Sequence, residues 1–441
     1  MLGACSLGGL GHLRPLGSVL DILRDRGDTV AVVAPPAMAD QVASIGHAFL
    51  PGVGPPESDL APLREQLSVL DADDASIVGN RDLFGRLATA AMLEPVREVV
   101  ETWTPDLIVR DPCEYASAVV ALGASMPVVQ VAISLAEVEW GSISAASPAL
   151  EEWCAGLTEA VRSTGYLTRL PESLDPSPFP STVRFRERSE AAAPLPDWWP
   201  GDHRPLVYAT FGTVLGHMST AVESMKVLLD AVGRLDARVL LTTGRAVEPA
   251  VLGSVPEHVH VEQWVEQASV LDEASVVVCH GGSGTTFGAL AEGLPVVVVP
   301  MFADQAVNAG VVARAGAGIV VRPTDRRQLL ASDADAIESA VRVLIDDVSR
   351  VGAGRRGSGF AGEATRIATE MAAMPVLLQV VTDRGVPIAR VVGIDASTKL
   401  VRLTDEGVIG RPRSGKRPVA RDRTRPRPRR SVTEHVTEQR R

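Results

Sequence analysis

The feature that most constrains the fold is an apolar, β-branched run that ends in a histidine and a group of glycines. Residues 275–279 read Ser-Val-Val-Val-Cys, and His280 follows them. A run without alternation predicts a strand buried on both faces, as in a parallel sheet covered by helices. The glycines predict a tight turn into a helix that extends through Ala291. The stretch therefore predicts an α/β fold.

The same turn predicts a site for an anion. The free N–H groups at a helix N-terminus bind phosphates, and glycines let a ligand approach the backbone closely. Ser283, Thr285 and Thr286 offer hydroxyl groups, which we also expect to cap the helix. His280 would add a further donor to the same phosphate. An ordinary glycine-rich turn beside a satisfied histidine is the alternative.

The first 34 residues predict a βαβ unit with a helix over about 15–26 and a second strand over 28–34. The dinucleotide fingerprint GxGxxG is incomplete, because Arg14 stands where its third glycine would be, so a nicotinamide cofactor is disfavoured. His12 lies at the start of this helix, and Pro15 suits the first helical turn. The positive end of the helix dipole favours a neutral imidazole, as a general base requires. A helix-capping histidine is the alternative.

Asp111 is our candidate for the partner of His12. It follows an apolar strand expected over 107–109, and ligands of open α/β sheets bind at the carboxyl ends of strands. Both residues follow such ends, so we expect their side chains to lie close together. An aspartate before a proline is also a common turn or N-cap residue, which is the alternative.

The segments EQWVEQA at 262–268 and MFADQAVNA at 301–309 flank the glycine turn. Together the three resemble the donor-binding signature of the nucleotide-sugar-dependent glycosyltransferases of the GT-B fold, and more narrowly the actinobacterial macrolide and antibiotic group. The resemblance covers about residues 1–370. It implies two Rossmann-like domains facing across a cleft. It also implies metal-independent transfer of a sugar, with inversion, from a nucleotide diphosphate to a hydroxyl of a natural-product aglycone.

The resemblance also implies roles for single residues. His12 would be the catalytic base, and Asp111 would orient it and stabilise the imidazolium. Trp264 would stack on the donor base, and the Val265 backbone would bind the edge of that base. The other donor-binding residues would hold the diphosphate or the sugar: Thr213, Gln267, His280, Gly282, Ser283, Gly284, Thr285, Asp304 and Gln305.

Two positions depart from the family pattern. Glu266 stands where proline is usual, which affects the shape of the local loop. Gly288 stands where users of UDP-glucose carry a glutamate that binds both ribose hydroxyls. Thymidine donors have no 2′-hydroxyl, so a site without that carboxylate predicts a dTDP-sugar, typically an activated deoxysugar, in preference to a UDP-sugar. A glycine that permits close helix packing is the alternative.

A metal-bridged mechanism would favour an Asp-x-Asp pair at the end of a strand. Residues 71–73 and 333–335 have this spacing, but both stand at polar helix starts, so we expect them to be caps. We therefore expect no metal site and no cofactor besides the nucleotide diphosphate sugar, which is a co-substrate.

The length of 441 residues suits two domains with substantial cores. We expect an acceptor-binding domain over 1–175, a linker over 176–203 and a nucleotide-sugar-binding domain over 204–375. Residues 376–441 form an atypical tail, which is basic and, by composition, disordered from about 411. Within the first domain, the weakly patterned residues 51–90 are expected on the acceptor side.

The remaining expectations concern location and partners. Four cysteines without paired spacing favour a reducing, cytoplasmic setting, and no apolar run of ~18 residues predicts a membrane span. The arginines of the tail are not interleaved with aromatic residues, so we expect no nucleic-acid partner. Because some relatives need a protein activator, an activator or a second copy of the chain stays open as a partner.

Two other classes of function would fit the same fold. One is a nucleotide-sugar epimerase, which would want several carboxylates around the sugar. The other is a protein that binds the donor without turnover and would lack the base. His12 and Asp111 together disfavour both alternatives.

Overall fold

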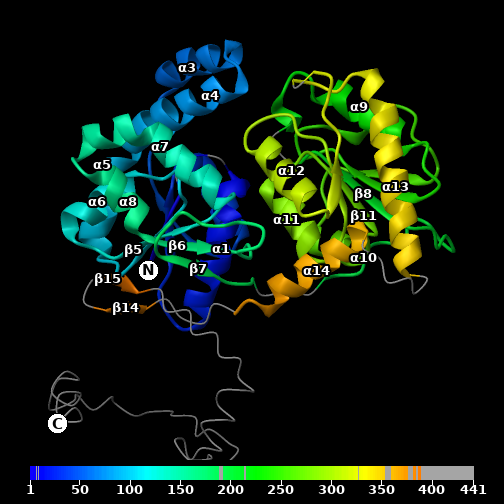
Figure 1. Cartoon of the computed structure of the whole chain (residues 1–441). Helices are drawn as coiled ribbons and strands as arrows, with labels where there is room; N and C mark the ends of the chain where they lie inside the picture. Colours follow the sequence, from blue (N-terminus) through cyan, green and yellow to red (C-terminus); the bar gives the residue numbers. More distant parts are fainter. Residues whose placement is uncertain are drawn as a thin grey trace, which may run out of the picture. The chain divides into compact units, whose positions relative to one another are not determined.

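The chain folds into two parallel sheets with helices around them, as expected for an α/β protein (Figure 1). A separate two-stranded antiparallel sheet pairs β14 (Val381–Asp383) with β15 (Val386–Ile388). The computed structural model describes residues 1–5, 7, 9–187, 192–212, 215–325, 327–352, 359–375, 381–383 and 386–388.

The first sheet has seven parallel strands in the order β3-β2-β1-β4-β5-β6-β7. Chain order changes direction between β1 and β4, so the loops after these two strands leave the sheet in opposite directions. Such a switch point is where open α/β sheets bind ligands. The bounds are β1 (Leu2–Ala4), β2 (Ala31–Ala34), β3 (Ala48–Pro51), β4 (Ile108–Arg110), β5 (Val128–Val131), β6 (Gly165–Thr168) and β7 (Thr182–Arg184).

The second sheet has six parallel strands in the order β10-β9-β8-β11-β12-β13. Its switch point lies between β8 and β11, and the glycine turn follows β11. Val276, Val277 and Val278 of β11 are fully buried, as their β-branched run predicted. The bounds are β8 (Leu206–Thr210), β9 (Arg238–Thr242), β10 (Val259–Glu262), β11 (Val276–Cys279), β12 (Val296–Val298) and β13 (Gly318–Val320).

Helices connect the strands of each sheet. In the first half they are α1 (Leu10–Asp25), α2 (Ala39–Ser44), α3 (Glu57–Val69), α4 (Ala72–Val78), α5 (Thr89–Trp103), α6 (Ala116–Ala124), α7 (Ala136–Trp153) and α8 (Leu157–Ser163). In the second half they are α9 (Ala221–Val232), α10 (Gln267–Glu273), α11 (Ser283–Ala291), α12 (Gln305–Arg314), α13 (Ala334–Gly352) and α14 (Phe360–Ala373). A π-helical segment, η2 (Gly79–Ala88), joins α4 to α5, so the weakly patterned stretch after residue 56 is largely helical.

The start of α1 differs from the expectation. The helix begins at Leu10 rather than near Pro15, which places His12 in its first turn and Pro15 inside it. Pro15 has no N–H to donate to the carbonyl four residues earlier. The first turn is held by other bonds, such as the one that the His12 N–H donates to Gly9 O at 3.2 Å. The histidine side chain is therefore carried by the helix itself.

Two further observations bear on the expected organisation of the chain. β7 lies inside residues 176–203, which we expected to be a linker, and pairs with β6. The basic tail from about 411 lies outside the described residues.

In the part of the chain that the structure describes, every helix is too short or too polar to cross a membrane.

Candidate active site

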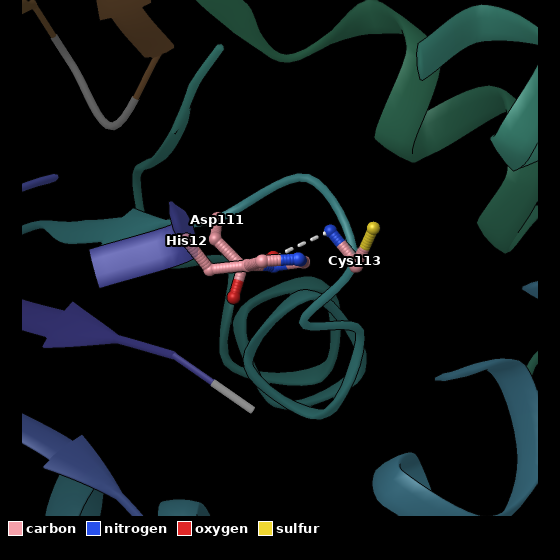
Figure 2. Close-up of side chains that lie close together, drawn as sticks. All are labelled: His12, Asp111 and Cys113. Atoms are coloured by element: carbon pink, nitrogen blue, oxygen red, sulfur yellow. Dashed lines mark hydrogen bonds and ion pairs between the residues drawn. The ribbon is translucent and has the colours of Figure 1, made fainter. Parts of the chain in front are cut away.

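His12 and Asp111 meet at the switch point of the first sheet. β1 leads into α1, whose first turn carries His12, and β4 ends one residue before Asp111. His12 Nδ1 lies 3.2 Å from Asp111 Oδ1 (Figure 2). The imidazole is 19% exposed, whereas the Asp111 side chain is fully buried. Because Nδ1 faces the carboxylate, Nε2 is the ring nitrogen available to a second partner.

The surroundings of Asp111 favour its charged form. Burial alone would raise the pKa of this carboxyl, but the charge and hydrogen bond of His12 and the amide of Cys113 outweigh burial and hold the pKa below its usual value. The Cys113 N–H donates to Asp111 Oδ1 at 2.7 Å. Asp111 is thus a turn residue as well as the partner of His12, so the two alternatives raised by the sequence occur together.

The loop that carries Asp111 is held by Arg110, which the sequence reasoning missed. Its guanidinium is fully buried and donates to the carbonyls of Glu114 at 2.6 Å and Pro112 at 2.9 Å, and to Gln130 Oε1 at 3.1 Å. An arginine at the end of an apolar strand is the signal that could have revealed it, since a buried guanidinium needs several acceptors. These bonds hold the chain on the C-terminal side of the aspartate and connect it to β5.

His280 packs against two glycines of the second sheet. A Cβ at Gly212 would lie 2.7 Å from His280 Cε1, and one at Gly282 would lie 2.5 Å from Nε2. The ring is only 9% exposed, and burial lowers the pKa of His280 to about 4, against a smaller opposite effect of Asp304. Its Nδ1 is buried without a hydrogen-bond partner among the described residues. His280 is therefore neutral at neutral pH and has an unsatisfied nitrogen.

The hydroxyl groups of the glycine turn do not cap α11, contrary to expectation. Gly282 is the N-cap residue, and no described side chain binds the first N–H groups. The Ser283 hydroxyl instead donates to Asp304 Oδ2 at 3.1 Å, and Thr286 Oγ1 lies 3.5 Å from Cys279 Sγ. Other acceptors nearby attract these hydroxyls, so the helix N-terminus is left for an anion.

Asp304 is the acceptor at the centre of a polar cluster. Its Oδ2 accepts hydrogen bonds from Ser134 Oγ at 2.5 Å, Ser283 Oγ at 3.1 Å and Asn308 Nδ2 at 3.0 Å. Gln305 is nearly buried, and its Oε1 accepts from the amides of Met301 at 2.8 Å and Phe302 at 3.0 Å. Asp304 thus joins the start of α11 to α12 and to the loop that carries Ser134, whereas the Gln305 carbonyl oxygen holds the loop before α12.

Ser134 reaches this cluster from the loop after β5, a contact that no local sequence pattern indicated. Glu139 holds the loop, because its Oε1 accepts from the amides of Ile133 at 2.7 Å and Ser134 at 2.8 Å. Burial raises the pKa of Glu139 to about 8. Glu139 is one of two acidic residues, with Glu137, in the first turn of α7, and this position alone does not indicate the contact.

Trp264 is 36% exposed, and the guanidinium of Arg245 lies 5.0 Å from its ring centroid. Arg245 was not predicted, although it follows the carboxyl end of β9. Gln267 Nε2 donates to the Gly284 carbonyl at 3.3 Å and would lie 3.1 Å from a Cβ at Gly288. Trp264, Gln267 and the start of α11 therefore belong to one region, and Val265 follows Trp264 in the chain. Thr213 lies outside the described residues.

A cavity of about 590 Å³ lies beside the loop that follows β12, where Met301, Phe302 and Ala303 line it. Phe84, on η2, lies in its wall and stacks on His12 with ring centroids 5.9 Å apart. The cavity therefore lies next to a direct neighbour of His12. Most of its larger lining side chains are apolar: Leu67, Leu70, Phe84, Met218, Met301 and Phe302.

The two Asp-x-Asp pairs hold helix starts, as expected. Asp71 is the N-cap of α4 and accepts from the amides of Asp73 at 3.0 Å and Asp74 at 2.9 Å. Asp333 accepts from the amides of Thr324 and Leu330 in the turn before α13.

Comparison with known proteins gives consistent matches. Residues 226–384 match the family model described as the C-terminal domain of erythromycin biosynthesis protein CIII-like proteins. The elloramycin glycosyltransferase of Streptomyces olivaceus is 32% identical over 374 residues, covering 77% of this chain and 91% of that protein. The L-demethylnoviosyl transferase of Streptomyces niveus is 30% identical over 325 residues, covering 71% and 83%. The crystal structure of the glycosyltransferase VinC in complex with dTDP is similar at a TM-score of 0.64 and 22% identity, covering 86% of this chain and 97% of that one.

Proposed function

The chain belongs to the antibiotic glycosyltransferases of the GT-B fold, and we propose that it moves a sugar from a dTDP-linked donor to a hydroxyl of a natural-product aglycone, with inversion at the anomeric carbon. Family membership makes it a glycosyltransferase. The observation that carries the proposed inverting transfer is the contact of 3.2 Å between His12 and Asp111 at the switch point of the first sheet.

In this proposal His12 is the general base. The Asp111 carboxylate accepts a hydrogen bond from Nδ1–H, so the lone pair of the neutral ring is on Nε2. Nε2 removes the proton of the acceptor hydroxyl as the oxygen attacks the anomeric carbon, opposite the departing nucleotide diphosphate. Asp111 then stabilises the imidazolium that forms. A single displacement from the opposite face inverts the configuration at that carbon.

The leaving diphosphate gathers negative charge, and the second sheet offers donors for it. The open N–H groups at the start of α11 point at such a ligand, and the neutral His280 ring can donate one N–H. Preorganised donors in a site that excludes water stabilise developing charge strongly. Thr213, the other residue expected here, lies outside the described residues and its role stays a prediction.

The preference for dTDP over UDP rests on Gly288. No carboxylate stands at this position to accept hydrogen bonds from two ribose hydroxyls. The complex of VinC with dTDP, a protein of the same fold, supports a thymidine donor. A Cβ at position 288 would lie 3.1 Å from Gln267 Nε2, so close packing is a second explanation for the glycine. The donor preference therefore needs its own test.

We expect wild-type protein to bind dTDP more tightly than UDP, and Gly288→Glu to shift the preference toward UDP because the new carboxylate would pair with the 2′- and 3′-hydroxyls. Competition between the two nucleotides, followed by calorimetry, measures this. Gly288→Gln serves as the matched control, since it has the same size without the charge. Equal or tighter binding of UDP by the wild type would contradict the inference.

The acceptor is proposed to be a largely apolar aglycone. A cavity of about 590 Å³ lies in the usual range for a site that buries most of a small ligand. Phe84 and Phe302 provide flat surfaces in its wall, and Phe84 is beside the base. An aglycone lying against Phe84 could present its hydroxyl to His12 Nε2.

The proposed function is tested by incubating the full chain with dTDP- and UDP-sugars and a panel of hydroxylated aglycones. Mass spectrometry detects the glycoside, and NMR of the anomeric proton reports its configuration. Transfer with inversion, or slow hydrolysis of the donor, supports the proposal. Conversion of one nucleotide sugar into another would instead indicate an epimerase, and binding without turnover a non-catalytic protein.

A further inference from the structure

Cys113 lies beside the His12–Asp111 pair but has no part in the proposed transfer. It follows Asp111 by two residues, on the same tight turn. One ligand atom from each of His12, Asp111 and Cys113 can be chosen so that all three lie within 4.8 Å of one another. Figure 2 shows the three side chains around the turn. The cluster brings together an imidazole nitrogen, a carboxylate oxygen and a thiol sulfur.

This set of donors matches the preferences of zinc. Zinc binds imidazole nitrogen and carboxylate oxygen at about 2.0–2.2 Å and thiolate sulfur at about 2.3 Å, usually with tetrahedral geometry. Neighbouring ligand atoms in such a site are roughly 3.3–3.8 Å apart. His12 Nδ1 and Asp111 Oδ1, at 3.2 Å, already have nearly this spacing. The sulfur lies within 4.8 Å of the chosen nitrogen and oxygen, so it would need to close by about 1.5 Å at most, which rotation of the Cys113 side chain can supply.

We propose that His12 Nδ1, Asp111 Oδ1 and Cys113 Sγ form an inhibitory site for a thiophilic divalent cation, with zinc as the best-fitting ion. Three protein ligands leave the fourth tetrahedral position open to water. The inference that binding inhibits rests on the proposed role of His12, whereas the inference that the cation binds rests only on the geometry of the three side chains.

Occupation of the site removes the base by changing the tautomer of His12. The cation takes the place of the Nδ1 proton, and a neutral imidazole then carries its proton on Nε2. Nε2–H cannot accept the proton of an acceptor hydroxyl. The Cys113 thiol must lose its proton to bind, so one proton is released to solvent for each cation bound, while the proton on His12 only changes nitrogen.

The thiol is not suited to an alternative role as a nucleophile. Burial, and next the charge of Asp111, raise the pKa of Cys113 well above its usual value, so the thiol is protonated in the metal-free protein. Cys113 itself is buried, whereas the His12 side chain of the same cluster is 19% exposed.

Binding is tested with Co²⁺, which takes the place of zinc and gives an absorption band when a thiolate coordinates it. The purified full chain is stripped with a chelator and titrated with CoCl₂. We expect a thiolate-to-cobalt band that saturates at one equivalent and disappears when Zn²⁺ is added. Cys113→Ser and Cys113→Ala should lose the band, while Cys154→Ser, at the C-terminal end of α7, is the matched control that should keep it. A band that persists in both Cys113 variants, or no band in the wild type, would overturn the proposed site.

Inhibition is tested in the same proteins by titrating Zn²⁺ into the transfer assay. Each variant is compared with its own metal-free rate. The Cys113 variants should need at least ~10-fold more Zn²⁺ for half inhibition than the wild type or Cys154→Ser, since one of three ligands is gone. Equal zinc sensitivity would overturn inhibition through this cluster. If the wild type transfers no sugar, the proposed function fails, but the cobalt band still decides whether the site exists.

Discussion

At the scale of single residues, His12 is held through one ring nitrogen by a buried carboxylate. We expect His12→Ala to lose about 10²-fold or more of the transfer rate, as removal of a general base does, with nearly unchanged nucleotide binding. Asp111→Asn should lower the rate and alter its pH dependence, because the imidazolium loses its anionic partner. Steady-state kinetics and calorimetry with dTDP measure both effects. Turnover like that of the wild type in His12→Ala would reject the base.

His280 gives a residue-scale prediction about stability. Its pKa of about 4 lies below the ordinary value of 6.5, so between these pH values the unfolded chain binds a proton that the folded chain does not. Above pH 6.5 His280 is neutral in both states, so its pKa shift does not change the free energy of unfolding. As the pH drops from 6.5 to 4, the shift lowers the free energy of unfolding by roughly 3 kcal/mol.

Urea unfolding of wild type and His280→Gln across this range measures the effect. The other titrating groups are shared, so they cancel in the difference between the two proteins. We expect the variant to gain stability relative to the wild type as the pH falls. A difference that does not change with pH would show that His280 is not held neutral.

At the scale of elements, the loop from β4 to α6 depends on Arg110. Arg110→Met would leave two buried carbonyls and an amide oxygen without their donor, so we expect a loss of about 3 kcal/mol in the free energy of unfolding. Because the loop also carries Asp111, the transfer rate should fall as well. Arg64→Met is the control, since its ion pair with Glu57 is exposed to solvent and should contribute little to stability. Similar losses in both variants would contradict this account of the loop.

At the scale of the whole molecule, the two sheets supply the proposed base and the proposed phosphate site, so residues 411–441 have no assigned part in the chemistry. They hold twelve Lys or Arg against three Asp or Glu, and they lie outside the described residues. We expect a chain that ends at residue 410 to keep the transfer rate and the dTDP affinity of the full chain. Parallel kinetics of the two chains at matched ionic strength check this. A large loss of either quantity would assign the tail a role in the site.

Local sequence patterns were sufficient for the α/β class, the glycine turn after β11 and the pairing of His12 with Asp111. Each depends on neighbouring residues or on a general rule: apolar runs form buried strands, and residues after parallel strands gather at one edge of a sheet. The start of α1 was predicted five residues late, because Pro15 was interpreted as the first residue of the helix. In the structure, tertiary packing tolerates Pro15 inside the helix.

Only the tertiary structure decided which side chains share partners. Ser283 was expected to cap α11, but its hydroxyl binds Asp304, and Ser134 reaches the same carboxylate from residues distant in sequence. Arg245 beside Trp264 and Cys113 beside His12 likewise depend on which loops converge. A strand or helix is recorded in the spacing of adjacent residues, whereas a hydrogen bond between loops depends on strand order and on competition among nearby acceptors, neither of which any single stretch of sequence contains.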